Sequence, residues 1–145
     1  MFISKKDLER LVLIGGKLET NNYLNDEIIN YEMTRMMKQQ ELSWSPNSYF
    51  FAKLRESGNA NYHDSYLQTR RWGKKHDIFA LNCLCFHVNT AVHWSFVYVT
   101  GLRHIETWTF EHEHDDSKPK CVVYHFDSLN HDTENLISPH IRHFY

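Results

Sequence analysis

The spacing of apolar residues predicts an amphipathic helix in the first third of the chain. Asn25 or Asp26 can cap its amino-terminal end. A shorter helix is expected to begin at the capping-box residues 4–7 and to end before the Gly pair at 15–16, with a loop up to residue 22. The apolar residues at helical spacing in the longer helix are Ile28, Ile29, Met33, Met36 and Met37. The three methionines among them are expected in the core.

The pattern changes to that of strands after residue 77. The preceding segment, residues 59–75, is polar and mixed, and is expected to be helical around 67–72. Stretches rich in β-branched and aromatic residues then alternate with turn-like breaks, and 111–120 reads as a charged loop. We predict an α+β fold in a single domain, 1–145, with a helical part at about 1–77 and a sheet part at about 78–129. The expected strands are Ile78–Val88, Trp94–Thr100, Ile105–Phe110 and Cys121–Phe126.

Composition limits the classes of function. The chain has 145 residues, 41% of them hydrophobic, and a net charge of −2, which favours one globular domain without a general attraction to nucleic acid or to an anionic membrane. No segment approaches the roughly 20 apolar residues that span a bilayer. Three cysteines without a framework spacing fit a reducing compartment, so an intracellular location, nucleus or cytoplasm, is expected.

Two titratable residues stand at the boundaries of predicted strands. His93 comes just before one strand and Asp127 just after another. If these strands pair antiparallel, the start of one lies beside the end of the other, and the carboxylate can orient the imidazole as a general base. A structural histidine beside Trp94 is the alternative, and spacing alone favours it.

Five sequence blocks resemble those of one protease family. YLNDEIINY at 23–31 is similar to the WLNDEIINFY element of Ulp/SENP proteases, and NSYFFAKL at 47–54 to their NTFFxxKL. RRWGKKHDIF at 70–79 resembles xRWTKKVDxF. VHW at 92–94 and FDSL at 126–129 resemble the blocks that carry the family's His and Asp, and all five occur in the family's order.

The resemblance implies a papain-like cysteine protease fold of the Ulp/SENP type, without a cofactor. Its activity would be peptidase or isopeptidase cleavage after the Gly-Gly end of SUMO or a related ubiquitin-like protein. His93 would be the general base and Asp127 its orienting partner. Trp94 and Tyr23 would line the tunnel for the Gly-Gly tail, and Asp26 would contact the modifier.

The chain departs from the family pattern in ways that affect activity. The Gln and the Asp-Cys-Gly nucleophile block that follow the Asp in the family do not occur in this sequence. We therefore expect the amino-terminal part of a catalytic domain, inactive as given, or alternatively a truncated SUMO-binding module. Tyr23 replaces a Trp, and His87 stands where a Pro is typical.

Other candidate sites have simpler structural interpretations. Cys83, Cys85 and Cys121 are expected to be buried core residues rather than displaced nucleophiles. The histidines of EHEHDD at 111–116 could bind a metal ion, but a solvated loop is the preferred interpretation and no metal is expected. The basic residues of 70–75 are interpreted as a solvated face rather than a nuclear-localisation patch.

Overall fold

The computed structural model describes residues 24–56, 67, 69–90, 93–110 and 119–129. The chain divides into two compact units, Met1–Gln40 and Glu41–Tyr145, and each is described by itself. The prediction of one domain over 1–145 therefore stays a prediction. The short helix expected from the capping box at 4–7 to the Gly pair at 15–16, and the loop up to residue 22, lie outside the described residues.

The first unit contains helix α2, Asp26–Met37, which confirms the amphipathic helix. Asn25 is its cap, because the side-chain Oδ1 accepts a hydrogen bond of 3.1 Å from the backbone N–H of Ile28. Ile28, Ile29 and Met33 are buried as expected. Met36 is 51% exposed, so its assignment to the core is wrong: it lies on the same side of the helix as Ile29 and Met33, but in the last turn, where the burial of that side has ended.

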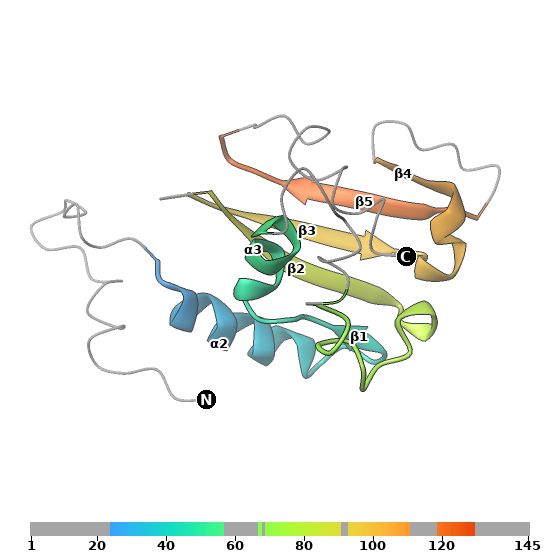
Figure 1. Cartoon of the computed structure of the whole chain (residues 1–145), viewed down its shortest axis with the longest axis horizontal. Helices are drawn as coiled ribbons and strands as arrows, with labels where there is room; N and C mark the ends of the chain where they lie inside the picture. Colours follow the sequence, from blue (N-terminus) through green and yellow to red (C-terminus); the bar gives the residue numbers. More distant parts are fainter. Residues whose placement is uncertain (1–23, 57–66, 68, 91–92, 111–118, 130–145) are drawn as a thin grey trace, which may run out of the picture. The chain divides into compact units, whose positions relative to one another are not determined.

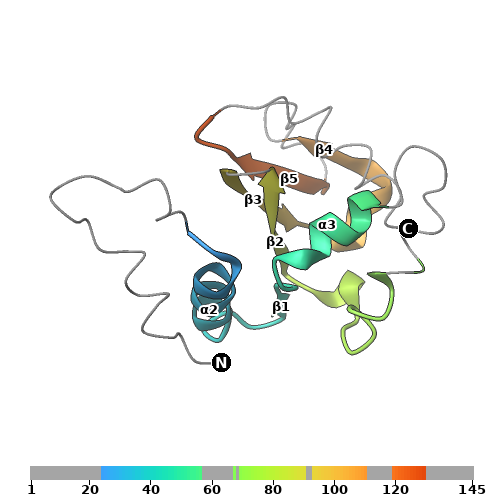
Figure 2. The same cartoon turned by 60° about the vertical axis from the view of Figure 1, so that its left-hand side comes forward.

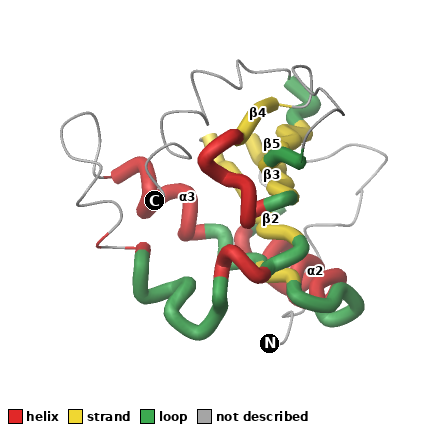
Figure 3. Tube along the Cα trace, turned by 90° about the vertical axis from the view of Figure 1, so that its right-hand side faces the viewer, coloured by secondary structure: helices red, strands yellow, loops and turns green. Residues whose placement is uncertain are grey.

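The second unit is built on a five-stranded mixed sheet in the order β1-β2-β3-β5-β4. Antiparallel pairing joins β2 to β3 and β3 to β5, whereas β1 pairs parallel with β2 and β4 parallel with β5. Figure 1 shows β2, β3, β5 and β4 lying side by side in this order, and Figure 3 shows the same succession in the tube. The strands are β1, Ser43–Trp44; β2, Cys83–Thr90; β3, His93–Thr100; β4, Trp108–Phe110; and β5, Cys121–Phe126.

Helix α3, Tyr49–Glu56, covers one face of this sheet (Figure 2). Its Phe50 and Phe51 are each 1% exposed: Phe51 stacks on Phe86 of β2, Phe50 meets the same ring edge-on, and Leu54 joins the same core. The sheet contributes the alternate residues that point to this side, as expected for a period of two. They are Leu84, Phe86, Val88, Val97, Val99 and Val123.

The observed elements differ from the predicted ones at several boundaries. Ile78–Ala80 forms a 3-10 helix, and the strand expected from Ile78 begins only at Cys83. Leu102–Thr107 forms another 3-10 segment, so the strand expected from Ile105 is reduced to β4. Short-range hydrogen bonds such as Leu81 N–H to Ile78 C=O replace ladder bonds there. The helix expected around 67–72 gives way to turns from Arg70 onward. Strand β5 agrees with its prediction.

Together these elements confirm the α+β fold class, with helices preceding a mixed sheet. Within the described residues, no helix is long and apolar enough to cross a membrane.

The end of β3 depends on a glycine. Gly101 has φ +66, a conformation that side-chain-bearing residues rarely adopt. A Cβ atom at this position would lie 2.2 Å from the backbone carbonyl oxygen of Lys120, the residue before β5. The turn after β3 and the approach of β5 therefore require glycine.

We predict that Gly101→Ala lowers the free energy of unfolding by about 2–4 kcal/mol, because it combines backbone strain with a clash against backbone. Gly73→Ala is the matched control, since its nearest contact is the end of the Ile78 side chain at 2.9 Å, which can move. Urea unfolding followed by circular dichroism measures both. Equal losses for the two variants would contradict this account of the turn.

Candidate functional site

The pairing of β3 with β5 brings His93 and Asp127 together. The backbone register aligns Phe96 with Phe126 and Thr100 with Val122, so the start of β3 lies beside the end of β5. His93 is the first residue of β3, and Asp127 directly follows β5. The sheet therefore places them as the antiparallel arrangement considered from the sequence requires.

The two side chains form a short hydrogen bond. Nε2 of His93 lies 2.6 Å from Oδ1 of Asp127, and the side chains are 17% and 3% exposed. A carboxylate only accepts hydrogen bonds, so Nε2 carries the proton and donates it. With Nε2 held in this way, Nδ1 is the ring nitrogen that would accept a proton from a reacting group.

The carboxylate is itself held in place by the chain that follows it. Oδ1 of Asp127 also accepts a hydrogen bond of 2.8 Å from the backbone N–H of Leu129. A carboxylate this deeply buried is costly unless such donors surround it. The turn after β5 therefore fixes the orientation of the group that orients His93.

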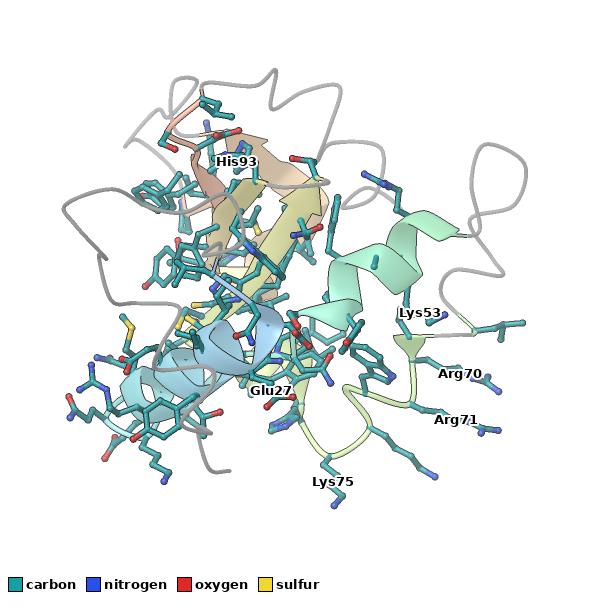
Figure 4. All side chains as sticks on the ribbon, turned by 90° about the vertical axis from the view of Figure 1, so that its left-hand side faces the viewer. Glu27, Lys53, Arg70, Arg71, Lys75 and His93 are labelled. Carbon is teal, nitrogen blue, oxygen red and sulfur yellow. The ribbon has the colours of Figure 1, made fainter. Side chains whose placement is uncertain are left out.

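His93 and Trp94 project from opposite faces of β3. His93 shares its face with Val97, on the side covered by α3, and lies beyond the apolar core at the end of the sheet where β3 begins (Figure 4). Trp94 is half-buried on the other face, where its ring meets that of His87 edge-on at 6.4 Å.

The remaining predicted substrate-binding residues lie in the first unit. Asp26 is half-buried in the first turn of α2. Tyr23 lies outside the described residues. The binding roles of Tyr23, Asp26 and Trp94, and the catalytic roles of His93 and Asp127, stay predictions.

The three cysteines are buried, as expected of core residues. Cys83 is 7% exposed, while Cys85 and Cys121 are 0% exposed. Burial raises the pKa of Cys121 to about 12, and burial together with the neighbouring Cys83 raises that of Cys85 to about 12. Both thiols are protonated at neutral pH, so neither serves as a displaced nucleophile.

A second polar pair, which the sequence reasoning missed, lies beside the first. Nε2 of His125 on β5 lies 2.9 Å from Oγ of Ser95 on β3. Ser95 is 4% exposed. The period-two spacing of His93 with Ser95, and of His125 with Asp127, was the available signal.

His87 occupies an apolar, aromatic setting on β2. Its ring lies 5.5 Å from that of Phe96, and its Nδ1 is buried with no hydrogen-bond partner among the described residues. Burial lowers the pKa of this imidazole from 6.5 to about 4. His87 is therefore neutral at physiological pH, next to Trp94.

The other candidates give no site within the described part of the chain. No group of three potential ligands that could hold a metal ion occurs there, and the histidines at 112 and 114 lie outside it. The side chains of Arg70, Arg71, Lys74 and Lys75 are exposed, and those labelled in Figure 4 point outward. This agrees with a solvated face.

We predict that the free energy of unfolding falls as the pH drops from about 6.5 to about 4, partly because of His87. In this window the imidazole of His87 binds a proton in the unfolded chain but not in the folded chain. The contribution of His87 to stability is therefore full above pH 6.5, and its loss is complete below pH 4. His87→Phe removes this titration and should reduce the loss by about 1–2 kcal/mol, allowing for partial exposure. Urea titrations at several pH values measure it, and an unchanged pH dependence in the variant would contradict it.

Comparison with known proteins gives a consistent set of relatives. No protein-family model matches the chain. A probable ubiquitin-like-specific protease 2B of Arabidopsis thaliana is 28% identical over 133 residues, 88% of this chain and 14% of that protein. Human sentrin-specific protease 2 is 26% identical over 128 residues (83% and 18%), and human sentrin-specific protease 5 is 32% identical over 95 residues (65% and 11%).

Among solved structures, the chain resembles a de-sumoylating protease with a TM-score of 0.54 and 20% sequence identity. The match covers 81% of this chain and 47% of that one. At this identity it shows the fold alone, and it confirms the fold expected from the motifs. The chain spans less than a fifth of the curated relatives named above and about half of the solved protease.

Proposed function

Because this chain is related to the Ulp/SENP proteases over much of its length, we propose that it supplies the base and the orienting carboxylate of a SUMO-type cysteine protease. The observation that carries the proposal is the 2.6 Å hydrogen bond between His93 and Asp127 at the edge of the sheet core. The substrate would be SUMO or a related ubiquitin-like protein, as a precursor or as a conjugate, inside the cell.

The chemistry divides between this chain and a nucleophile that follows it in a longer protein. Nδ1 of His93 takes the proton of the cysteine thiol while Asp127 holds Nε2. The thiolate attacks the carbonyl carbon of the second glycine of Gly-Gly, and the imidazolium then protonates the departing amine. Water, deprotonated by His93, hydrolyses the thioester and regenerates the thiol.

Selectivity for the Gly-Gly tail is assigned to Trp94 and Tyr23. The flat indole of Trp94, the residue after His93 in β3, would form one wall of a narrow passage that admits a peptide without side chains and excludes bulkier residues. Asp26, in the first turn of α2, would contact the surface of the modifier.

We predict that a longer protein, containing this chain and an Asp-Cys-Gly nucleophile block, cleaves a SUMO precursor after Gly-Gly. His93→Ala should lower kcat by about 10³-fold or more, and Asp127→Asn by roughly 10²–10⁴-fold, because the base is removed or loses its orientation. Release of the tail, followed by mass spectrometry, measures this.

The matched control is His76→Ala, which removes an exposed imidazole that stacks on Trp44 at 5.1 Å. It should leave kcat unchanged. A wild-type longer protein that cleaves no ubiquitin-like precursor, or an Asp127→Asn variant with full activity, would overturn the proposed function.

A second candidate is a binding module that holds SUMO-like proteins without cutting them. The burial of all three thiols favours it for the chain of residues 1–145 taken alone, because none can form an adduct with substrate. Binding would use the same proposed contacts at Trp94, Tyr23 and Asp26.

For this module, we predict saturable binding of fluorescently labelled SUMO to the 145-residue chain, without adduct formation by a SUMO vinyl sulfone. Trp94→Ala should weaken binding by about 10-fold or more, whereas Trp94→Phe, which keeps an aromatic face, should weaken it less. Fluorescence anisotropy measures both. Absence of binding, or equal binding by all three proteins, would remove the module from consideration.

A further inference from the structure

We propose that Ser95 and His125 form a positioning pair that holds Asp127 at the correct distance from His93. The inference rests on the proposed function, since that function gives the His93–Asp127 pair its task. Neither Ser95 nor His125 is assigned contact with substrate.

The two pairs repeat the same geometric relationship across the two strands. His93 and Ser95 lie two residues apart on one face of β3, and His125 and Asp127 lie two residues apart around the end of β5. In each pair the β5 residue lies diagonally across from its β3 partner, at 2.6 Å for one bond and 2.9 Å for the other. Extending the register by one residue beyond Phe96–Phe126 places Ser95 opposite Asp127.

Asp127 lies just beyond the backbone ladder that joins β3 to β5. That ladder runs from Thr100–Val122 to Phe96–Phe126. Strand ends open more readily than strand centres, so a side-chain link near the end limits how far Asp127 can move. The Ser95–His125 hydrogen bond is such a link, because it crosses the last ladder pair, Phe96–Phe126, and joins the residue before Phe96 to the residue before Phe126.

Because Ser95 is buried, its hydroxyl depends on the hydrogen bond with His125. The Ser95 side chain is 4% exposed, so its hydroxyl needs a partner, and Nε2 of His125 provides one. Either the hydroxyl donates to Nε2 or Nε2–H donates to the hydroxyl, according to the tautomer of His125. In both cases, removing one partner leaves a polar group that draws water or shifts the strand.

The short distance between His93 and Asp127 makes this pair sensitive to loss of the Ser95–His125 bond. A charge-assisted hydrogen bond of 2.6 Å weakens when its atoms separate, and small misplacements of catalytic groups cost rate steeply. Loss of the Ser95–His125 bond should therefore loosen His93 from Asp127, although neither of those residues is changed.

The test observes the proton shared by His93 and Asp127 directly. In the chain of residues 1–145, the Nε2 proton of His93 should give a low-field NMR signal, assigned by its loss in His93→Gln. Ser95→Ala should raise the exchange rate of this proton with water by about 10-fold or more. Ser95→Thr, which keeps the hydroxyl, should change it by less than about 3-fold.

Tyr98→Phe is the matched control on the same strand. It removes a hydroxyl on the opposite face of β3 from Ser95, and should leave the His93 signal unchanged. If Ser95→Ala does not fold, His125→Gln and His125→Phe decide, since the first keeps a hydrogen-bonding group and the second does not. An exchange rate that is equal in the wild type, Ser95→Ala and His125→Phe, absence of the wild-type signal, or unfolding of every variant would overturn the proposal.

The kcat and KM of a longer protein distinguish a positioning role of Ser95 from a merely structural one. Ser95→Ala should lower kcat by about 10-fold or more with KM within about 2-fold, because binding groups are untouched. Equal loss in Tyr98→Phe would contradict it. If the longer protein cleaves nothing, the proposed function fails, while the NMR result on the 145-residue chain still decides whether the pair positions the dyad.

Discussion

The antiparallel pairing of β3 with β5 is the constraint on which the candidate site depends. His93 and Asp127 are 34 residues apart in sequence, and only this register brings them to 2.6 Å. A carboxylate that is 3% exposed requires donors, and the structure supplies the imidazole of His93 and the backbone N–H of Leu129. The same pairing that builds the core therefore also builds the dyad.

The alternation of side chains along β3 separates two tasks. Val97 and Val99 pack beneath α3, and His93 and Ser95 continue that face beyond the core. Trp94 points to the other face, where His87 and Phe96 lie. A slip of one residue would exchange the two faces, so the buried valines also protect the placement of the proposed base and tunnel wall.

Local sequence patterns predicted several elements of the fold, whereas the other elements depend on tertiary contacts. The Asn25 cap and the apolar spacing of α2 were readable, as was β5, because cap chemistry and β-branched runs act locally. Helix α3 was not predicted, since the cluster Tyr49-Phe50-Phe51 becomes helical by packing on the sheet. The strand expected from Ile78 begins later, because residues Ile78–Ala80 form a 3-10 turn. The apolar character of these residues did not indicate that turn.

The candidate site was partly readable for the same reason. His93 and Asp127 mark strand ends, so pairing the strands suggested their contact, whereas the diagonal link from Ser95 to His125 needed the exact register. Among the described residues, Nδ1 of His87 has no hydrogen-bond partner, and this could not be read from sequence because it depends on the rings that surround the imidazole.

The central claim is that Asp127 makes His93 an effective base for a cysteine nucleophile. The most direct measurement is the rate at which a SUMO vinyl sulfone labels that cysteine in a longer protein containing this chain, at saturating probe. We predict a decrease of about 10²-fold or more in Asp127→Asn, because the imidazole loses its orientation. Labelling of the variant at the wild-type rate would contradict the account.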